Sequence, residues 1–208
     1  MMSVAIVTSR PRCPRCERAQ NACICTWVRA LEHRVEVLIL QHPLELRQAK
    51  GSARLLHLSL RHSQLVTGEV FDAPTLQALL TAPRAKQAIL LYPDMPHDQT
   101  PGLLAPAPLS SVTLDEPSNL CLIVLDGTWR KSRKMLYLNP ALQCLPRLAL
   151  RDPPASRYRI RRAHRPEQLS TLEATCAALA QLEGGTAQFA ALLAAFDGFV
   201  AQQSERFL

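Results

Sequence analysis

Positions 122–134 join an apolar run to a carboxylate, a tight turn and a row of basic side chains. Residues 122–125 have the pattern of a strand buried on both faces, and Asp126 stands at its carboxyl end. Gly127 allows the backbone to turn, and Thr128 is a candidate cap for a following helix. Because α/β proteins bind ligands at the carboxyl ends of their strands, this junction is the first candidate site.

Asp126 and Trp129 are the candidate catalytic residues of this junction. A positioned carboxylate can accept a proton or orient a substrate, and a flat indole ring can stack on adenine or on a target base. Both residues also have structural interpretations, since Asp126 could shape the turn and Trp129 could pack in the core. The following helix would present cations to an anionic ligand, namely Arg130, Lys131, Arg133 and Lys134.

A second basic segment lies at positions 147–165, where seven arginines are opposed only by Asp152. Arginine grips phosphate through two parallel hydrogen bonds, and Tyr158 can stack on an unpaired base, so this composition favours RNA over a membrane surface. A solvated strand edge is the alternative. Residues 157–161 alternate, which would direct one set of side chains to a ligand cleft. The candidate RNA contacts here are Arg157, Tyr158, Arg159 and Arg162.

Four cysteines near the start of the chain have the spacing of a metal site. Cys13 and Cys16 are separated by two residues, the spacing with which a turn presents two thiolates to one ion, and Cys23 and Cys25 can supply the second pair. Four thiolates complete the tetrahedron of a closed structural zinc site. In a reducing compartment we favour this interpretation over two disulfides or free thiols. Neighbouring arginines could touch nucleic acid or form a solvated basic face.

Composition limits the classes of partner and compartment. The 208 residues carry a formal net charge of +7 and a pI near 9.3, which favours polyanionic partners. With 48% hydrophobic residues, the chain can build one catalytic-sized domain and a small appendage. No apolar run approaches the roughly 20 residues of a membrane span, and positions 1–10 lack a signal-peptide core. We expect a cytoplasmic protein with no membrane partner.

Strand and helix patterns alternate along the rest of the chain. Strands are predicted at 35–40, 65–71, 87–92, 122–125 and 145–150, and helices at 49–60, 75–81, from 129 onward, 174–182 and 186–199. This alternation predicts a parallel sheet flanked by helices. The Pro- and Ser-rich stretch from Tyr92 to Pro117 is a surface loop over the edge of the sheet, and is either a lid or a connection without a role.

Two further polar positions have competing interpretations. His42, at the end of the first strand, is either a hydrogen-bonded structural residue or a substrate contact. Ser170 and Glu173 have the spacing of a capping box at a helix start. The same helix start could instead offer backbone N–H groups to the carboxylate of a ligand.

Six motifs, taken in order, resemble those of the DTW-domain family of tRNA-uridine aminocarboxypropyltransferases, placed in the SPOUT-like superfamily. They are Cys13-x2-Cys16-x6-Cys23-x-Cys25, Gln41-His-Pro-x-Glu45, Leu91-Tyr-Pro93, Leu125-Asp-Gly-Thr-Trp129 with its basic helix, Ser156-Arg-Tyr-Arg-Ile-Arg161 and Ser170-Thr-Leu-Glu-Ala174. The resemblance spans nearly the whole chain. It departs from the common pattern at Gly51-Ser52, where relatives carry Asn-Thr.

The resemblance implies an α/β, parallel-sheet SPOUT-like domain at 33–208, with a C-terminal knot, and a zinc knuckle at 1–32. It implies transfer of the 3-amino-3-carboxypropyl group of S-adenosylmethionine to N3 of a tRNA uridine, with methylthioadenosine as the coproduct. Zinc would be structural and tRNA the partner. The sequence shows no decisive subunit interface, so we expect a monomer, with a dimer as the alternative. The implied cofactor-binding residues are Leu91, Pro93, Leu125, Gly127, Thr128, Arg161, Thr171, Glu173 and Ala174.

Two other functions remain open from the residues. The same donor could supply a methyl group to RNA, in which case adenosylhomocysteine would be the coproduct. A zinc-containing RNA-binding module without catalysis would bind tRNA and yield neither product. The mass of the product nucleoside separates these hypotheses.

Overall fold

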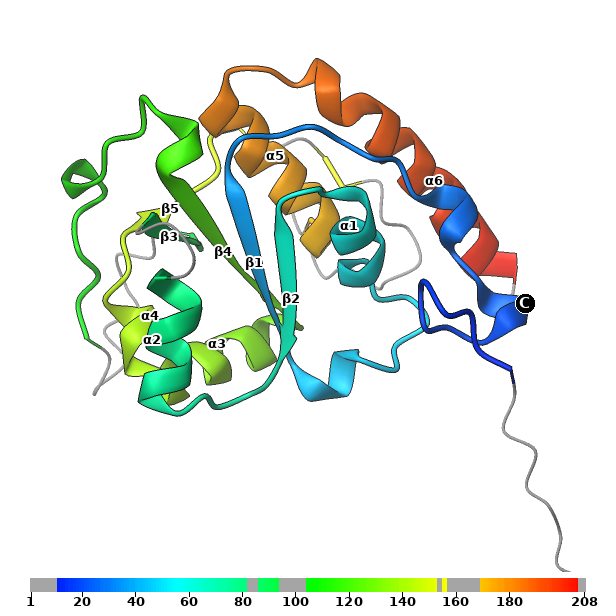
Figure 1. Cartoon of the computed structure of the whole chain (residues 1–208), viewed down its shortest axis with the longest axis horizontal. Coiled ribbons are helices and arrows are strands. Elements are labelled where there is room, and N and C mark those ends of the chain that lie inside the picture. Colours follow the sequence, from blue (N-terminus) through cyan, green and yellow to red (C-terminus); the bar gives the residue numbers. More distant parts are fainter. Residues whose placement is uncertain (1–10, 82–85, 94–103, 153–154, 157–168, 206–208) are drawn as a thin grey trace, which may run out of the picture.

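The computed structural model describes residues 11–81, 86–93, 104–152, 155–156 and 169–205. Its centre is a five-stranded sheet in the order β2-β1-β4-β3-β5, in which every neighbouring pair is parallel (Figure 1). The strands are β1 (Glu36–Gln41), β2 (Ser63–Thr67), β3 (Gln87–Leu91), β4 (Leu120–Asp126) and β5 (Arg147–Leu148). The predicted parallel α/β fold is therefore confirmed.

Helices cover both faces of this sheet. They are α1 (Ala53–Ser59), α2 (Ala73–Thr81), α3 (Trp129–Leu138), α4 (Pro140–Gln143), α5 (Thr171–Glu183) and α6 (Ala190–Glu205). Single turns of 3₁₀ helix lie at Gln20–Ala22, Cys25–Trp27, Pro43–Glu45, Leu109–Ser111, Pro117–Asn119 and Ala187–Phe189. Helices α1, α5 and α6 pack on one face and α2, α3 and α4 on the other (Figure 1).

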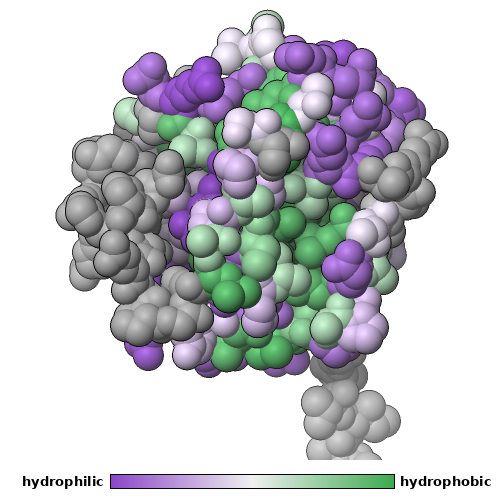
Figure 2. All heavy atoms as spheres, turned by 90° about the vertical axis from the view of Figure 1, so that its left-hand side faces the viewer, coloured by the Kyte–Doolittle hydropathy of each residue, from purple (hydrophilic) through white to green (hydrophobic). Residues whose placement is uncertain are grey.

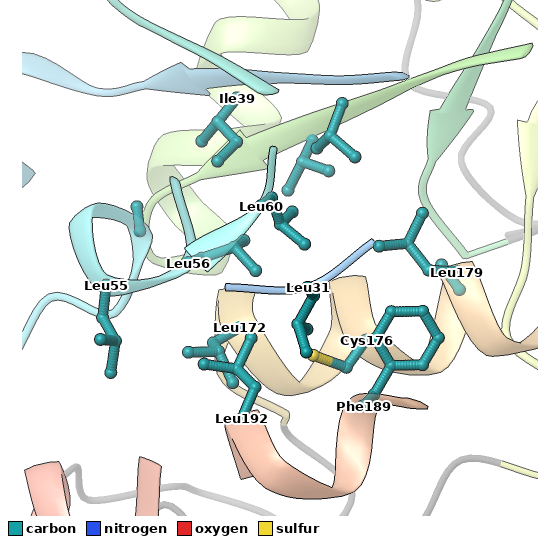
Figure 3. Close-up of a cluster of buried hydrophobic side chains, with 14 of the residues drawn as sticks. Leu31, Ile39, Leu55, Leu56, Leu60, Leu172, Cys176, Leu179, Phe189 and Leu192 are labelled. Carbon is teal, nitrogen blue, oxygen red and sulfur yellow. The ribbon is translucent and has the colours of Figure 1, made fainter. Parts of the chain in front are cut away.

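Two hydrophobic clusters, one on each face, hold these layers together. Along β1, Val37 and Ile39 point into the cluster with α1, α5 and α6, whereas Leu38 and Leu40 point into the other. The larger cluster is drawn in Figure 3, where side chains from α1, α5 and the 3₁₀ turn before α6 converge beneath the sheet. Burial on both faces explains why β1 and β4 are continuous apolar runs.

The order of the strands creates a switch point between β1 and β4. From β1 the chain passes through α1 to β2 on one side, and from β4 it passes through α3 and α4 to β5 on the other side. The two strands are paired in register, with Gln41 opposite Asp126 at their carboxyl ends. Crevices at such points are where doubly wound sheets bind ligands.

Several predicted boundaries are wrong, each for a local reason. The strand predicted at 65–71 ends at Thr67, because the amide of Phe71 donates to Asn139 Oδ1 instead of to a neighbouring strand. The helix predicted at 49–60 begins only at Ala53, and 145–150 contributes just the two residues of β5. The last predicted helix is preceded by a 3₁₀ turn and extends to Glu205.

The described part of the predicted Tyr92–Pro117 loop comprises residues 92–93 and 104–117, and residues 104–117 run along the edge of the sheet (Figure 1). The amide of Leu104 donates to Gln143 and that of Ala107 to the Cys144 carbonyl, and these bonds hold the segment to the end of α4.

Hydrophobic residues occupy the middle of the side of the molecule shown in Figure 2, and hydrophilic residues border them. Within the described ranges, no helix has the length and apolar character needed to cross a membrane.

Candidate ligand site at the switch point

The Asp126 carboxylate is the centre of the candidate site. It is only 4% exposed, and each of its oxygens accepts a hydrogen bond. Gln41 Nε2 donates to Oδ2 at 2.8 Å, and Thr171 Oγ1 donates to Oδ1 at 2.6 Å. Both donors come from elements distant in the sequence, so the carboxylate joins β1, β4 and α5. Two donors on one carboxylate fix its orientation.

Backbone pairing explains why these groups meet. The β1–β4 ladder places Gln41 beside Asp126, and the His42 amide continues it by donating to the Asp126 carbonyl at 2.9 Å. Thr171 is the first residue of α5, whose start is fixed by a capping box. The β1–β4 pairing and the capped start of α5 therefore determine where the two donors meet the carboxylate.

The first strand and its 3₁₀ turn provide three polar side chains, and each reaches a different element. Gln41 reaches Asp126 on β4, as described above. His42 Nε2 lies 2.9 Å from Oε1 of Glu69 in the loop after β2, and Glu45 accepts from Lys131 Nζ of α3 at 2.7 Å. The motif Gln41-His-Pro-x-Glu45 thus fixes three neighbours of the site.

Hydrogen bonds occupy both ring nitrogens of His42. Its Nδ1 accepts from the amide of Leu44 at 3.1 Å, so Nε2 is the nitrogen that donates to Glu69. Both ring nitrogens are occupied, and the residue is 5% exposed. The hydrogen-bonded interpretation of His42 is confirmed.

Glu69 attaches the loop after β2 to α3. Its Oε1 also accepts from Lys134 Nζ at 3.0 Å. Hydrogen bonds from Lys134 and then from His42 lower the pKa of the Glu69 carboxyl group. Lys131 and Lys134 are therefore both paired with acids, and the side chains of Arg130 and Arg133 lie exposed on the same helix.

The turn between β4 and α3 depends on close packing. A Cβ atom on Gly127 would lie 3.0 Å from the Lys131 Cβ, a contact so tight that Lys131 would have to shift to accommodate a larger residue. Thr128 occupies the N-cap position, but its side chain makes no capping hydrogen bond in the described structure. The predicted hydroxyl cap is therefore wrong, although the helix begins where expected.

Trp129 lies at the surface beside the turn, and the core-packing alternative is wrong, because its side chain is 45% exposed. The indole packs edge-on against Tyr92, with ring centroids 5.5 Å apart and an interplanar angle of 87°. The Arg147 guanidinium lies over the Tyr92 ring at 5.3 Å. Side chains at the carboxyl end of β3 and the start of β5 thus hold an exposed ring next to Asp126.

The start of α5 is closed by internal hydrogen bonds. Ser170 Oγ accepts from the Glu173 amide at 3.2 Å, and Glu173 Oε2 accepts from the Ser170 amide at 2.7 Å, which confirms the predicted capping box. The Leu172 amide donates to Ser52 Oγ at 3.3 Å, and the Ala174 amide to the Ser170 carbonyl at 2.9 Å. A ligand carboxylate would therefore need donors other than these amides.

The remaining predicted ligand contacts divide into two groups. Leu91 ends β3, Pro93 follows shortly after, and Leu125 precedes Asp126 on β4, so all three are partly buried at the same edge of the sheet. The other predicted contacts lie outside the described residues, and these are Arg157, Tyr158, Arg159, Arg161 and Arg162.

The four N-terminal cysteines form a second, separate site. Their sulfur atoms all lie within 4.8 Å of one another, with Sγ separations of 3.7 Å for Cys13–Cys25 and 3.8 Å for Cys16–Cys23. All four thiols are free, so the disulfide alternative is wrong. A zinc ion with bonds of about 2.3 Å requires tetrahedral edges of about 3.8 Å, so this donor set could hold such an ion.

The environment of these thiols is uneven. Backbone hydrogen bonds from Cys16 and Arg15 lower the pKa of the Cys13 thiol to about 6, whereas burial raises the pKa of Cys25 to about 12. The cluster also contributes to the main core, since Cys13, Cys16 and Ile24 belong to the same hydrophobic cluster as α5 and α6. Trp27 Nε1 donates to Gln202 of α6 at 2.8 Å and strengthens this attachment.

Sequence reasoning missed the partners of the central carboxylate and of α3. Gln41 and Glu45 stood in a motif without an assigned role, and Glu69 stood in no motif. A polar residue ending a strand that is otherwise apolar was the available signal for Gln41. Glu69 gave no comparable signal, because its partners come from two distant segments.

Comparisons with known proteins give a consistent result. Residues 10–204 match the family model described as DTW domain. The tRNA-uridine aminocarboxypropyltransferase 2 of Mus musculus is 29% identical over 178 residues, which cover 84% of this chain and 57% of that protein. The protein of the same name in Drosophila melanogaster is 31% identical over 189 residues, covering 84% of this chain and 67% of its own length. No solved structure matches.

Proposed function

We propose, from the premise that this chain belongs to the DTW domain family, that it transfers the 3-amino-3-carboxypropyl group of S-adenosylmethionine to N3 of a tRNA uridine. The chain spans little more than half the length of its mouse relative, so activity and substrates belong to this proposal. The observation that carries it is the buried Asp126 carboxylate, held between Gln41 and Thr171 at the switch point.

The reaction benefits from a base near the reacting nitrogen. A bond forms between uridine N3 and the terminal carbon of the aminocarboxypropyl group, the bond from that carbon to sulfur breaks, and methylthioadenosine leaves. The N3 proton passes to a base, and Asp126 is the candidate. Its two hydrogen-bond donors fix its orientation, so it can accept this proton or orient the uracil imide.

An exposed aromatic ring beside the carboxylate suits a target base. Trp129 is held by Tyr92 and begins the helix that carries Arg130 and Arg133. An unpaired base can stack on the indole while the arginines contact phosphates on either side. Lys131 would act mainly through its pair with Glu45, which fixes α3, and Arg157, Tyr158, Arg159 and Arg162 extend the proposed RNA surface.

The donor is proposed to lie between the carboxyl ends of β3 and β4 and the start of α5. The backbone around Leu91, Pro93 and Leu125, the turn at Gly127 and Thr128, and the first turn of α5 from Thr171 through Glu173 to Ala174 would form its walls. Because the Leu172, Glu173 and Ala174 amides already have acceptors, Arg161 is the preferred partner for the donor carboxylate.

The Cys₄ cluster is proposed to hold zinc in a structural role. Cys13, Cys16, Cys23 and Cys25 occupy all four positions of a tetrahedral ion, which leaves no position for a substrate. We also propose that the knuckle at 1–32 and the domain at 33–208 form a SPOUT-like protein with a C-terminal knot. The return of the chain to the switch point at Thr171 supports this arrangement.

Nucleoside analysis tests the proposal. Purified protein, S-adenosylmethionine and unmodified tRNA should yield a uridine heavier by one aminocarboxypropyl unit. A methylated nucleoside would instead identify a methyltransferase, and tRNA binding without either product would identify an RNA-binding module. Asp126→Asn should abolish turnover with little change in tRNA affinity, since the substitution keeps the shape of the side chain and removes its charge.

A further inference from the structure

We infer that Arg18 is a positioning residue that couples the metal-binding knuckle to a loop that contacts the start of α5 at the candidate site. The contacts lie within residues 11–27 of the knuckle, and the loop comprises residues 48–52. The effect on transfer rests on the proposed function, but the coupling itself does not. Neither the predicted metal ligands nor the predicted site residues include this arginine.

Arg18 binds the loop through two carbonyl groups. Its two terminal nitrogens donate to the Ala49 carbonyl at 2.5 Å and to the Gly51 carbonyl at 2.8 Å. The guanidinium also lies over the Phe199 ring of α6, 5.4 Å from its centroid. A planar fork satisfies two acceptors at once, which a lysine ammonium on a single flexible stem does not reproduce.

The knuckle holds Arg18 by its backbone. The Cys13 amide donates to the Arg18 carbonyl at 2.8 Å, and the Glu17 amide donates to the Cys13 carbonyl at 2.8 Å. The turn is therefore closed between the first two metal ligands and the arginine. Glu17, which has a positive φ of 58°, forms an ion pair with Arg54 of α1. A metal bound to Cys13 and Cys16 would fix this turn and hence the arginine.

The loop in turn contacts the start of α5. Ser52, which is 5% exposed, follows Gly51 directly and accepts from the Leu172 amide through its Oγ. The preceding residue of α5, Thr171, donates to Asp126. A continuous series of contacts therefore runs from the cysteine cluster through Arg18 and the loop to the central carboxylate.

Hydrogen exchange tests the coupling directly. The samples are the metal-loaded wild type, Arg18→Ala and Arg18→Lys, with Arg15→Ala as control because Arg15 is an exposed arginine of the same knuckle. We expect Arg18→Ala to speed exchange of the Gly51 and Leu172 amides by about tenfold, corresponding to about 1.4 kcal/mol. Arg18→Lys should resemble Arg18→Ala, and Arg15→Ala should resemble the wild type. Metal content and exchange within β4 should stay unchanged.

Removing the metal by chelation completes a thermodynamic cycle. In the wild type, loss of metal should speed exchange at Gly51 and Leu172, whereas in Arg18→Ala it should add little, because the connection is already broken. The inference would be overturned if these amides exchanged at the wild-type rate in metal-loaded Arg18→Ala. It would also be overturned if the effects of metal removal and of Arg18→Ala on the free energy of exchange were additive. These exchange measurements require no substrate. If the protein lacked transferase activity but the metal and Arg18 effects were still non-additive, only the proposed function would be refuted.

Discussion

The Thr171 hydroxyl lies 2.6 Å from Asp126 Oδ1, so the first residue of α5 contacts the last residue of β4, 45 positions earlier in the chain. This contact sets the rotamer of the carboxylate together with Gln41. A helix start near the end of the chain thus completes a site whose central residue belongs to an earlier strand.

Replacing Thr171 by valine should lower kcat/KM by about 10- to 100-fold. Valine keeps the shape of threonine but removes a hydrogen bond to a charged acceptor, which is worth about 1.5–3 kcal/mol. Thr171→Ser keeps the hydroxyl and is the control. Steady-state kinetics with saturating tRNA checks the effect, and equal losses in both variants would mean that the hydroxyl does not orient Asp126.

Removing the cation of the Glu45–Lys131 pair should destabilise the fold. Glu45 is nearly fully buried and its Oε1 accepts from Lys131 Nζ, so Lys131→Met leaves a buried carboxylate without this partner. We expect a loss of about 1–3 kcal/mol in the free energy of unfolding. Urea denaturation measures it, with Arg130→Met as an exposed control expected to change stability by about 0.5 kcal/mol or less. Equal midpoints for the two variants would refute this role for the pair.

Stability should fall as the pH drops below about 6.5, because burial lowers the pKa of His33 in the folded protein. His33 Nδ1 donates to the Val35 carbonyl at 2.7 Å and Nε2 accepts from the His62 amide at 3.2 Å, an arrangement that only the neutral ring satisfies. Between the lowered pKa of folded His33 and about pH 6.5, the unfolded chain binds the proton more readily than the folded chain does. The stability that neutral His33 contributes is therefore present above about pH 6.5 and is lost as the pH falls.

Urea denaturation of wild type and His33→Gln at about pH 7.5 and about pH 5.5 tests this pH dependence. The wild type should lose more stability than the variant over this interval. His57, whose pKa is also lowered by burial, should leave a residual slope in both proteins. The assignment to His33 would be untenable if the two slopes were the same.

Arg130 should contribute to tRNA affinity through a phosphate. The residue is exposed on α3, one position after Trp129. Arg130→Ala should weaken binding and reduce the slope of log affinity against log salt concentration by about one unit. Arg34, exposed just before β1 at the opposite end of the sheet, supplies the control. An Arg130→Ala slope that matches Arg34→Ala would exclude a phosphate contact at this position.

The elements that could be predicted from the sequence are those that a local pattern of residues determines. Continuous apolar runs predicted β1 and β4, and the Ser170–Glu173 spacing predicted the start of α5. The pairing of Gln41 with Asp126 depends instead on strand order, which no local pattern determines. The same holds for Arg18, whose acceptors are backbone carbonyls about thirty residues later and carry no side-chain signature.

The most direct test of the central claim uses two samples of S-adenosylmethionine, one labelled in the carboxyl carbon and one in the methyl carbon. If the switch-point site transfers the aminocarboxypropyl group, the carboxyl label will appear in tRNA uridine and the methyl label will remain in methylthioadenosine. Labelled tRNA and labelled methylthioadenosine should both be absent with Asp126→Asn. Methyl label in the tRNA, with carboxyl label left in adenosylhomocysteine, would contradict the account.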